Sequence, residues 1–272
     1  MQPVPWRCHD CFHGMQPAVT AGGVVVVIDV LRASTTIVTA LANGAIGVRT
    51  ERTAEAARAA AEAAGRSRGE CLLGGERGGL RIEGFDLGNS PREYSRDRVA
   101  GRRIVTTTTN GTAAVAACPD AEAILIGCLL NCQAVAVWAR ALARAGRWRP
   151  RPVHLVCAGT DGEPTEEDVL GAGAILHAIR LLGIREGAGS DSMTCDASAD
   201  EADERFKEAM WESRDLAPPF EGQLEKAFRA SRGGRNLLAI GMEADIACAA
   251  AIDSVPVVPR LDRGTGWFQL DS

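Results

Sequence analysis

The sequence predicts an α/β protein: a three-layer α/β/α sandwich around a mostly parallel sheet, with a mixed sheet as the alternative. Short β-branched apolar runs alternate with helical patterns, and the clearest run, residues 24–28, is continuously apolar. Continuous apolar strands are typical of parallel sheets covered on both faces, and strand–helix alternation is typical of βαβ units. We expect one domain over residues 1–272, with 1–21 as an N-terminal segment and 186–222 as a variable loop-and-helix region.

The first half of the chain is predicted to hold strand–helix units that lead into a long loop. After the strand at 24–28, a helix is expected from Ser34 or Thr35 to Asn43-Gly44, because Ser34 suits an N-cap and Gly44 a C-cap. The remaining elements of this half are expected to be a strand at 45–49, a helix at 53–64, an apolar stretch at 71–73 and a glycine-rich loop at 74–94.

The second half continues the alternation and ends in helices and a strand. Strands are expected at 103–108, 123–126, 153–157 and 255–258, where the runs are apolar and β-branched. Helices are expected at 111–118, 132–145, 166–182, 201–212, 221–231 and 243–252. The acidic segment 186–200 is expected to be an exposed loop, and Ala217-Pro218-Pro219 a helix breaker.

Three of the predicted strands run directly into polar clusters. In open parallel sheets ligands bind outside the carboxyl ends of the strands, so these clusters are expected to converge on one crevice. The first cluster contains Asp29, Arg32, Ser34 and Thr35, the second contains Thr109, Asn110, Gly111 and Thr112, and the third contains Gly159 and Thr160.

The residue types in these clusters suit a cation and an oxyanion. A carboxylate such as Asp29 can ligate Mg²⁺, Arg32 can hold an anion, and the 109–112 turn can offer hydroxyl and N–H donors. The structural alternatives are an Asp29–Arg32 ion pair and threonines that serve only as strand formers and caps. Asp168 belongs to an acidic run after the third cluster, where one or two carboxylates could complete a metal site or simply favour a helix start.

The glycine-rich loop 74–94 carries further candidates for anion binding: Glu76, Arg77, Arg81, Asn89 and Ser90. Loops of this length with little periodicity are usually functional or disordered. The loop is therefore interpreted as an anion-binding element or a lid, with a surface Ω-loop as the alternative.

Composition excludes several classes of protein. The formal net charge is −5 and aromatic residues make up 4%, which argues against a nucleic-acid binder. No signal peptide and no apolar stretch of membrane-spanning length is present, so we expect a cytoplasmic protein whose nine cysteines are free thiols. All basic residues except Lys207 and Lys226 are arginines, which we interpret mostly as composition bias.

The N-terminal run Cys8, His9, Cys11 and His13 resembles half of a zinc site, but no second pair at matching spacing follows. We expect a mobile or loosely packed segment there. Cys71 and Arg77 match the C-x5-R spacing of cysteine phosphatases, but Gly78-Gly79 follows where that mechanism needs a helix. His154 and His177 fall inside a strand and a helix, so a histidine-based phosphatase is not expected.

Several motifs together resemble the 2-phosphosulfolactate phosphatase family. They are VVVVIDVLRASTTIVTALANGA (24–45), LLGGERGGLRIEGFDLGNSPREY (72–94), IVTTTTNGTAA (104–114), VCAGTDGEPTEEDVLGAG (156–173) and DIACAAAIDSVPVVP (245–259). The resemblance implies a three-layer fold of the family's own type and an Mg²⁺-dependent phosphatase. The reaction it implies converts 2-phospho-3-sulfolactate into 3-sulfolactate and phosphate, a step of coenzyme M biosynthesis.

The resemblance and the clusters lead to one set of expectations for the site. Asp29, Arg32 and Glu76 are expected to be catalytic, and Mg²⁺ is expected on Asp29 with Glu76 or Asp168. The residues expected to bind the substrate are Ser34, Thr35, Arg77, Asn89, Ser90, Thr109, Asn110, Gly111, Thr112, Gly159 and Thr160. Asp29 as a nucleophile is an alternative, although Leu31 breaks the Asp-x-Asp pattern of aspartyl-phosphate phosphatases.

The expected partner is a small anionic phosphoester, and no binding to nucleic acid or membrane is expected. A homodimer is a further possibility. Two alternative functions also remain. One is a phosphatase of another small anionic phosphomonoester, which a substrate panel distinguishes. The other is a non-catalytic anion-binding domain, which would be stabilised by ligands but would release no phosphate.

Overall fold

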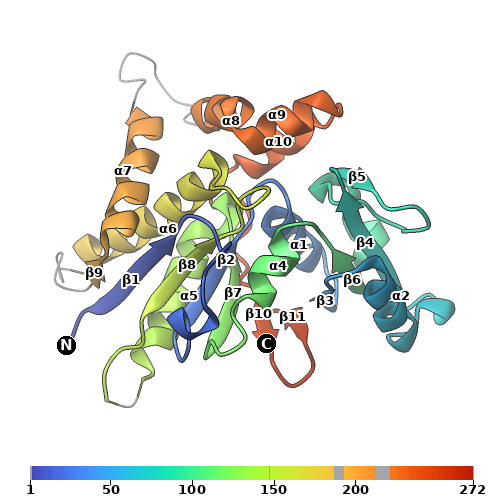
Figure 1. Ribbon diagram of the computed structural model, residues 1–272, viewed down its shortest axis with the longest axis horizontal. Helices are drawn as coiled ribbons and strands as arrows, with labels where there is room; N and C mark the ends of the chain where they lie inside the picture. The colour runs from blue at the N-terminus through green and yellow to red at the C-terminus, as the bar shows by residue number, and fades with distance from the viewer. Residues whose placement is uncertain (1, 147, 187–192, 212–220, 272) are drawn as a thin grey trace.

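The computed structural model describes residues 2–146, 148–186, 193–211 and 221–271, whose strands form one mixed eleven-stranded sheet. The order of the strands is β5-β4-β6-β3-β11-β10-β7-β2-β8-β1-β9. Helices cover both faces of the sheet, and α8, α9 and α10 lie together beyond one end of the central strands (Figure 1). The three-layer α/β/α architecture predicted from the sequence is therefore confirmed, with a mixed rather than purely parallel sheet.

The central strands form the core of the sheet. β2 (Val24–Ile28), β7 (Ala123–Gly127) and β8 (Val153–Cys157) are parallel and buried along their whole length. Full burial requires cover on both faces, which explains why these runs are continuously apolar.

The N-terminal segment is ordered, so the prediction of a mobile or loosely packed segment is wrong. β1 (Val4–His9) pairs in parallel with β8 and with β9 (Met193–Cys195). Its alternate residues Val4, Trp6 and Cys8 are buried in the core, with Trp6 only 1% exposed. The short alternating pattern, interrupted by Pro5, concealed a strand that long-range pairing stabilises.

A second parallel group contains β3 (Gly47–Thr50), β6 (Arg103–Thr107) and β4 (Cys71–Arg77), with the short antiparallel β5 (Leu80–Arg81) at its edge. The predicted loop 74–94 is therefore wrong at its start, because β4 continues to Arg77. Gly75 lies so close to the Thr107 carbonyl that a Cβ would collide with it, and its φ is +145°. The glycines that suggested a loop allow this close backbone pairing.

The two parallel groups are joined by an antiparallel hairpin, β10 (Arg260–Asp262) and β11 (Trp267–Gln269). The strand predicted at 255–258 is wrong, because those residues form no strand. The backbone there is held instead by the segment after β7: the Val255 amide donates to the Leu130 carbonyl, and the Asn131 side chain donates to the Val257 carbonyl at 2.8 Å.

The helices that follow the strands confirm most of the predicted ones, within a few residues. They are α1 (Ala33–Ala42), α2 (Ala54–Ala63), α3 (Arg96–Val99), α4 (Gly111–Ala116), α5 (Cys132–Arg144), α6 (Glu166–Arg185), α7 (Ala197–Trp211), α8 (Glu221–Ala230), α9 (Arg232–Ala239) and α10 (Glu243–Ala249). Short 3-10 turns lie at Pro17–Val19, Arg66–Arg68, Pro91–Glu93 and Leu129–Asn131. The alanine-rich α2 begins as its sequence predicts, since the Thr53 hydroxyl accepts from the Ala56 amide.

Two regions differ from the predicted helices and loops. The predicted loop 186–200 is wrong where it is described, because β9 and the first turn of α7 lie in it; residues 187–192 and the predicted breaker 217–219 lie outside the described residues. The helix α9 was not predicted, because Gly233 and Gly234 weaken its helical pattern. In α1 the N-cap is Arg32 rather than Ser34, so Ser34 lies inside the helix.

All nine cysteines lie in the described residues and are free thiols, as predicted. Among the described residues, no helix combines the length and the apolar character that crossing a membrane requires.

A buried histidine pair makes the fold sensitive to acid. His9 Nε2 lies 3.0 Å from His154 Nδ1, and the rings stack. Burial, with the neighbouring His9, lowers the pKa of His154 to about 4. A lowered folded-state pKa means that the unfolded chain binds more protons, so this stability is present above pH 6.5 and is lost as the pH falls toward 4.

We therefore expect the free energy of unfolding to fall by about 2 kcal/mol between pH 7 and pH 5 through His154. Urea unfolding of the wild type and of His154→Gln at both pH values measures this effect, and the variant should lose correspondingly less. The control is His13→Gln, at an exposed histidine, which should follow the wild type. Equal pH slopes for the wild type and His154→Gln would contradict the assignment.

Candidate functional site

The polar strand ends converge on one open cavity of about 440 Å³. Its wall contains residues that follow β2, β6 and β8, the end of β4, and the face of α9. The described residues that line it are Asp29, Leu31, Arg32, Glu76, Gly78, Gly79, Asn89, Thr108, Thr109, Asn110, Thr160, Asp161, Gly233, Asn236, Leu237, Ala239 and Ile240. The predicted convergence of the three clusters is therefore seen in the structure.

Asp29 lies at the end of β2, directly before α1. Its Oδ1 accepts from the Ala33 amide at 3.1 Å, and its own N–H donates to the Ser34 hydroxyl at 2.9 Å. Burial, together with the charges of Glu76 and Glu167, raises the pKa of Asp29 to about 6, although the Ala33 amide favours the ionised form. Gly111 leaves room for Oδ2, since a Cβ there would lie 2.7 Å from it. Asp29 is thus a fixed carboxylate with one oxygen held and the other available.

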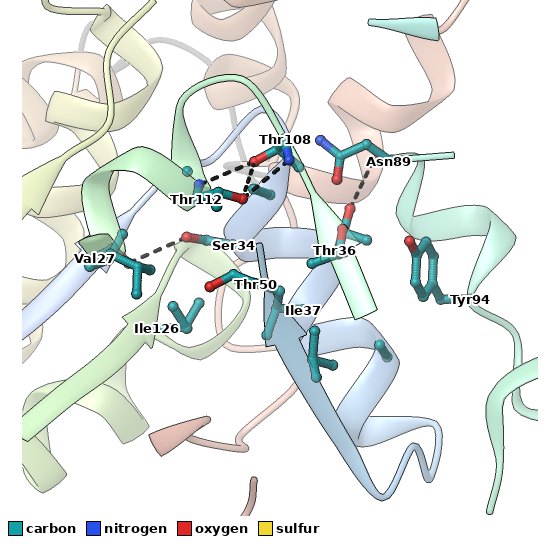
Figure 2. A pocket seen from close by; sticks show the side chains of 16 residues that line it. Val27, Ser34, Thr36, Ile37, Thr50, Asn89, Tyr94, Thr108, Thr112 and Ile126 are labelled. Atoms are coloured by element: carbon teal, nitrogen blue, oxygen red, sulfur yellow. Dashed lines mark hydrogen bonds between the residues drawn. The ribbon is translucent and has the colours of Figure 1, made fainter. Parts of the chain in front are cut away.

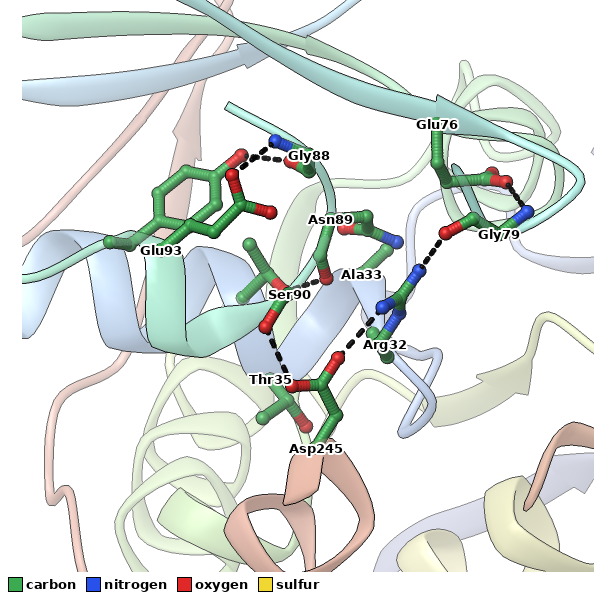
Figure 3. Close-up of polar contacts among 12 residues, drawn as sticks. Arg32, Ala33, Thr35, Glu76, Gly79, Gly88, Asn89, Ser90, Glu93 and Asp245 are labelled. Carbon is green, nitrogen blue, oxygen red and sulfur yellow. Dashed lines mark hydrogen bonds and ion pairs between the residues drawn. The ribbon is translucent and has the colours of Figure 1, made fainter. Parts of the chain in front are cut away.

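Glu76 is fixed from two sides at the end of β4. Its Oε1 accepts from the amide and hydroxyl of Thr109 at 2.9 and 3.0 Å. Its Oε2 accepts from the Gly79 amide at 2.8 Å (Figure 3). The side chain is 7% exposed. These contacts tie the end of β4 to the turn after β6 and hold the carboxylate at the cavity wall.

Arg32 reaches the cavity from a buried ion pair. One guanidinium nitrogen lies 2.7 Å from Asp245 Oδ2, and another donates to the Gly79 carbonyl at 2.7 Å (Figure 3). The side chains of Arg32 and Asp245 are 3% and 1% exposed. The alternative of an Asp29–Arg32 ion pair is therefore not what forms; the partner comes from α10, which sequence reasoning did not connect with this site.

Several residues predicted to bind the substrate point into the protein interior instead. Ser34 and Thr112 line a second, narrow cavity of about 10 Å³ (Figure 2). The Ser34 hydroxyl donates to the Val27 carbonyl, and the Thr112 hydroxyl lies 3.2 Å from that of Thr108. Gly111 also lines this inner cavity.

Three further predicted binders, Thr35, Ser90 and Arg77, are absent from the described lining and make structural contacts instead. Thr35 donates to the Val30 carbonyl at 2.8 Å, and Ser90 donates to Asp245 at 2.6 Å. Arg77 donates to the Glu76 carbonyl, the Arg52 carbonyl and the Thr107 hydroxyl, outside the wall of the open cavity. They support the site without lining it.

Asp168 lies behind the cavity wall. Its Oδ1 accepts from the Val30 amide at 2.7 Å and its Oδ2 from the Gly159 amide at 2.9 Å, so it joins the loops after β2 and β8. Burial beside Asp29 and Glu167 raises the pKa of Asp168 well above its usual range. The structure thus brings Asp29 and Glu76, but not Asp168, to the cavity surface.

The residues that sequence reasoning missed lie mainly on α9. This helix supplies Gly233, Asn236, Leu237 and Ala239, and Ile240 follows it. No motif marks them in the sequence, because a helix can join a distant site only through tertiary packing. Asp161 belongs to the predicted third cluster, and it pairs with Arg232 at 2.5 Å at the rim of the cavity.

The carboxylates that line the cavity are suitable ligands for a magnesium ion. Within the described residues no three His, Cys, Asp or Glu side chains could enclose a metal ion by themselves. Mg²⁺ typically takes one or two carboxylates and completes its shell with waters and substrate phosphate. Asp29 and Glu76 provide such a pair, and both border the open cavity.

Comparison with known proteins identifies the family of the chain. The family model described as 2-phosphosulpholactate phosphatase matches residues 13–264, which is nearly the whole chain. The chain belongs to the 2-phosphosulpholactate phosphatase family. As a member of this family it is a phosphomonoester hydrolase, so the alternative of a non-catalytic binding domain is set aside.

Curated relatives of the family are similar over most of their length. A protein of Deinococcus radiodurans named "Probable 2-phosphosulfolactate phosphatase" is 40% identical over 242 residues, covering 89% of this chain and 88% of its own. Relatives with the same name in Caldanaerobacter subterraneus subsp. tengcongensis and a Synechococcus strain are 36% and 37% identical. They cover 88% and 91% of this chain and 88% and 92% of their own lengths.

Proposed function

We propose that this phosphatase hydrolyses 2-phospho-3-sulfolactate to 3-sulfolactate and phosphate and that it requires Mg²⁺. One observation supports the metal most directly: the charged wall of the cavity is mostly acidic. Asp29 and Glu76 line it without a basic partner, while Arg32 is paired with Asp245 and Asp161 with Arg232. A substrate with several negative charges would be repelled by such a wall unless a cation lay between them. The names of the relatives support the choice of substrate.

In the proposed reaction the oxygen of a water molecule forms a bond to phosphorus, and the bond between phosphorus and the C2 oxygen breaks. The C2 oxygen leaves with a proton as the hydroxyl of 3-sulfolactate. Mg²⁺ bound by Asp29 and Glu76 would supply charge neutralisation for the phosphoryl oxygens.

The chain's own residues would orient the phosphate. Asn110 lies in the turn after β6 and offers side-chain amide donors, and Thr160 lines the same cavity from the turn after β8. Thr109, whose hydroxyl and amide both donate to Glu76, would keep that carboxylate in place. Arg32, held rigid by Asp245 and Gly79, would present its remaining N–H groups to an anionic oxygen. Rigid donors need no reorganisation during the reaction, which favours the transition state.

The proposal also includes the pathway and the cellular compartment in which the enzyme acts. The resemblance implies a step of coenzyme M biosynthesis, and the nine free thiols suit a reducing cytoplasm. A homodimer would be identified by sedimentation of the purified chain.

Phosphate release from a panel of phosphoesters, with and without EDTA, tests the proposal. We expect 2-phospho-3-sulfolactate to have the highest kcat/KM, EDTA to abolish the release, and added Mg²⁺ to restore it. Activity that survives chelation would remove the metal from the mechanism. A clear preference for a non-sulfonated ester would instead favour the runner-up, a phosphatase of another small anionic phosphomonoester.

A further inference from the structure

The helix α9 closes one side of the catalytic cavity and is anchored at both ends. At its start, Arg232 donates to the Thr160 carbonyl at 3.2 Å and pairs with Asp161 at 2.5 Å. The Ser231 hydroxyl caps the helix by accepting from the Gly234 amide at 3.1 Å. Beyond its end, Ile240 packs against Gly79, where a Cβ would lie 2.7 Å from the Ile240 side chain.

A second contact holds α9 close to the floor of the site. Gly233 lies directly over Glu167 of α6, and a Cβ at this position would collide with the Glu167 carboxylate. Glu167 is 2% exposed, and burial raises the pKa of its carboxyl, although its contacts with Ser231 and Gly233 favour the ionised form. These contacts therefore hold the helix α9 itself in place beside the cavity that Asp29 and Glu76 also line.

The chemistry of this wall differs from that of the wall it faces. The residues that α9 and the position after it add to the described cavity lining are mostly apolar: Gly233, Leu237, Ala239 and Ile240. Among them Asn236 alone is polar. The carboxylates and hydroxyls that suit the phosphate come from the strand ends. An apolar wall with one amide suits the carbon frame of a small substrate and a single oxyanion at its far end.

We propose that Asn236 is a specificity-determining residue, whose side-chain amide donates to the sulfonate, one of the two anionic groups of the substrate that do not react, the other being the carboxylate. This inference rests on the proposed function. An amide donor suits this place, because Asn236 is the one polar residue that α9 contributes to the described lining and because Arg32 is already paired with Asp245.

The test compares two esters that differ only in the sulfonate: 2-phospho-3-sulfolactate and 2-phospholactate. For Asn236→Ala we expect KM for the sulfonated ester to rise about tenfold, because a hydrogen bond to a charged group is lost. Its kcat and the KM for 2-phospholactate should stay within about twofold, since the bond serves binding alone. Asn236→Asp should raise KM for the sulfonated ester further, by about a hundredfold, through repulsion of like charges.

The matched control is Leu238→Ala, which changes an α9 residue that is 40% exposed and is absent from the described cavity lining. It should leave both KM values unchanged, and thermal unfolding should show that all three variants fold. An equal change in KM for both esters, or no change for either, would overturn the role of Asn236.

A binding measurement separates this inference from the choice of reaction. In the presence of Mg²⁺, 3-sulfolactate should raise the Tm of the wild type more than lactate does, and Asn236→Ala should remove that difference. If the wild type hydrolyses neither ester but shows this difference, the proposed reaction fails and the role of Asn236 stands. If 3-sulfolactate and lactate stabilise the wild type equally, the inference is wrong whatever the enzyme hydrolyses.

Discussion

Asp29→Asn is expected to lower kcat by about a thousandfold or more, because it removes a carboxylate that lines the cavity and is proposed to hold Mg²⁺. The fold should survive, since the asparagine carbonyl can still accept from the Ala33 amide that Asp29 now holds at 3.1 Å. Single-turnover and steady-state phosphate release, with Mg²⁺ at saturating concentration, measure the effect.

The metal-free stability of Asp29→Asn supplies a second result. The pKa of Asp29 is raised to about 6, so ionising it costs free energy in the folded state as the pH rises from about 4 through 6. Asparagine avoids that cost, so at pH 7 the metal-free variant should be at least as stable as the metal-free wild type. Below pH 4 this advantage should vanish.

The control for Asp29 is Glu163→Gln. Glu163 is an exposed carboxylate in the turn after β8, and it is absent from the described cavity lining. Its kcat should stay within about twofold of the wild type, because exposed charges in water act weakly over distance. If Asp29→Asn retained more than a tenth of the wild-type kcat, Asp29 would have no direct part in the chemistry.

Asp245→Ala is expected to have the largest effect on stability, a loss of about 3–5 kcal/mol. The substitution leaves the guanidinium of Arg32 buried without its carboxylate partner, and it also removes the acceptor of the Ser90 hydroxyl. Both contacts join α10 to loops that build the cavity (Figure 3). Urea unfolding measures the loss, and phosphate release under folding conditions should fall as well, because Arg32 loses its fixed position.

Glu243→Ala is the matched substitution in the same helix, at an exposed carboxylate. Its stability should remain within about 0.5 kcal/mol of the wild type, as is usual for surface positions. A loss of less than 1 kcal/mol for Asp245→Ala would show that the buried pair adds little and that Arg32 is held mainly by Gly79.

The parts of the site that the sequence could predict are those where one strand and its following turn act together. Asp29, Thr109, Asn110 and Thr160 each lie within three residues of the end of a strand, and parallel strands bring their carboxyl ends to one edge. The continuous apolar run of β2 and the glycine-containing turns carry this information locally. No knowledge of distant packing is needed to place these residues in the same crevice.

The sequence did not predict the direction of side chains that depends on the exact residue at which a helix begins. Ser34 and Thr112 lie within a few residues of the predicted turns, yet both hydroxyls are turned inward by hydrogen bonds to Val27 and Thr108. A shift of one or two residues at a helix start rotates a side chain away from the cavity, since successive helical residues differ by about 100°.

By itself, then, the sequence determined the α/β architecture, the polar strand ends and the family resemblance, because each depends on short stretches of chain. Only the tertiary structure decided which carboxylates reach the cavity, that Asp245 is the partner of Arg32, and that α9 forms the opposite wall. These features join segments that are up to about two hundred residues apart. Their free energy comes from burial and pairing across elements, which no local pattern encodes.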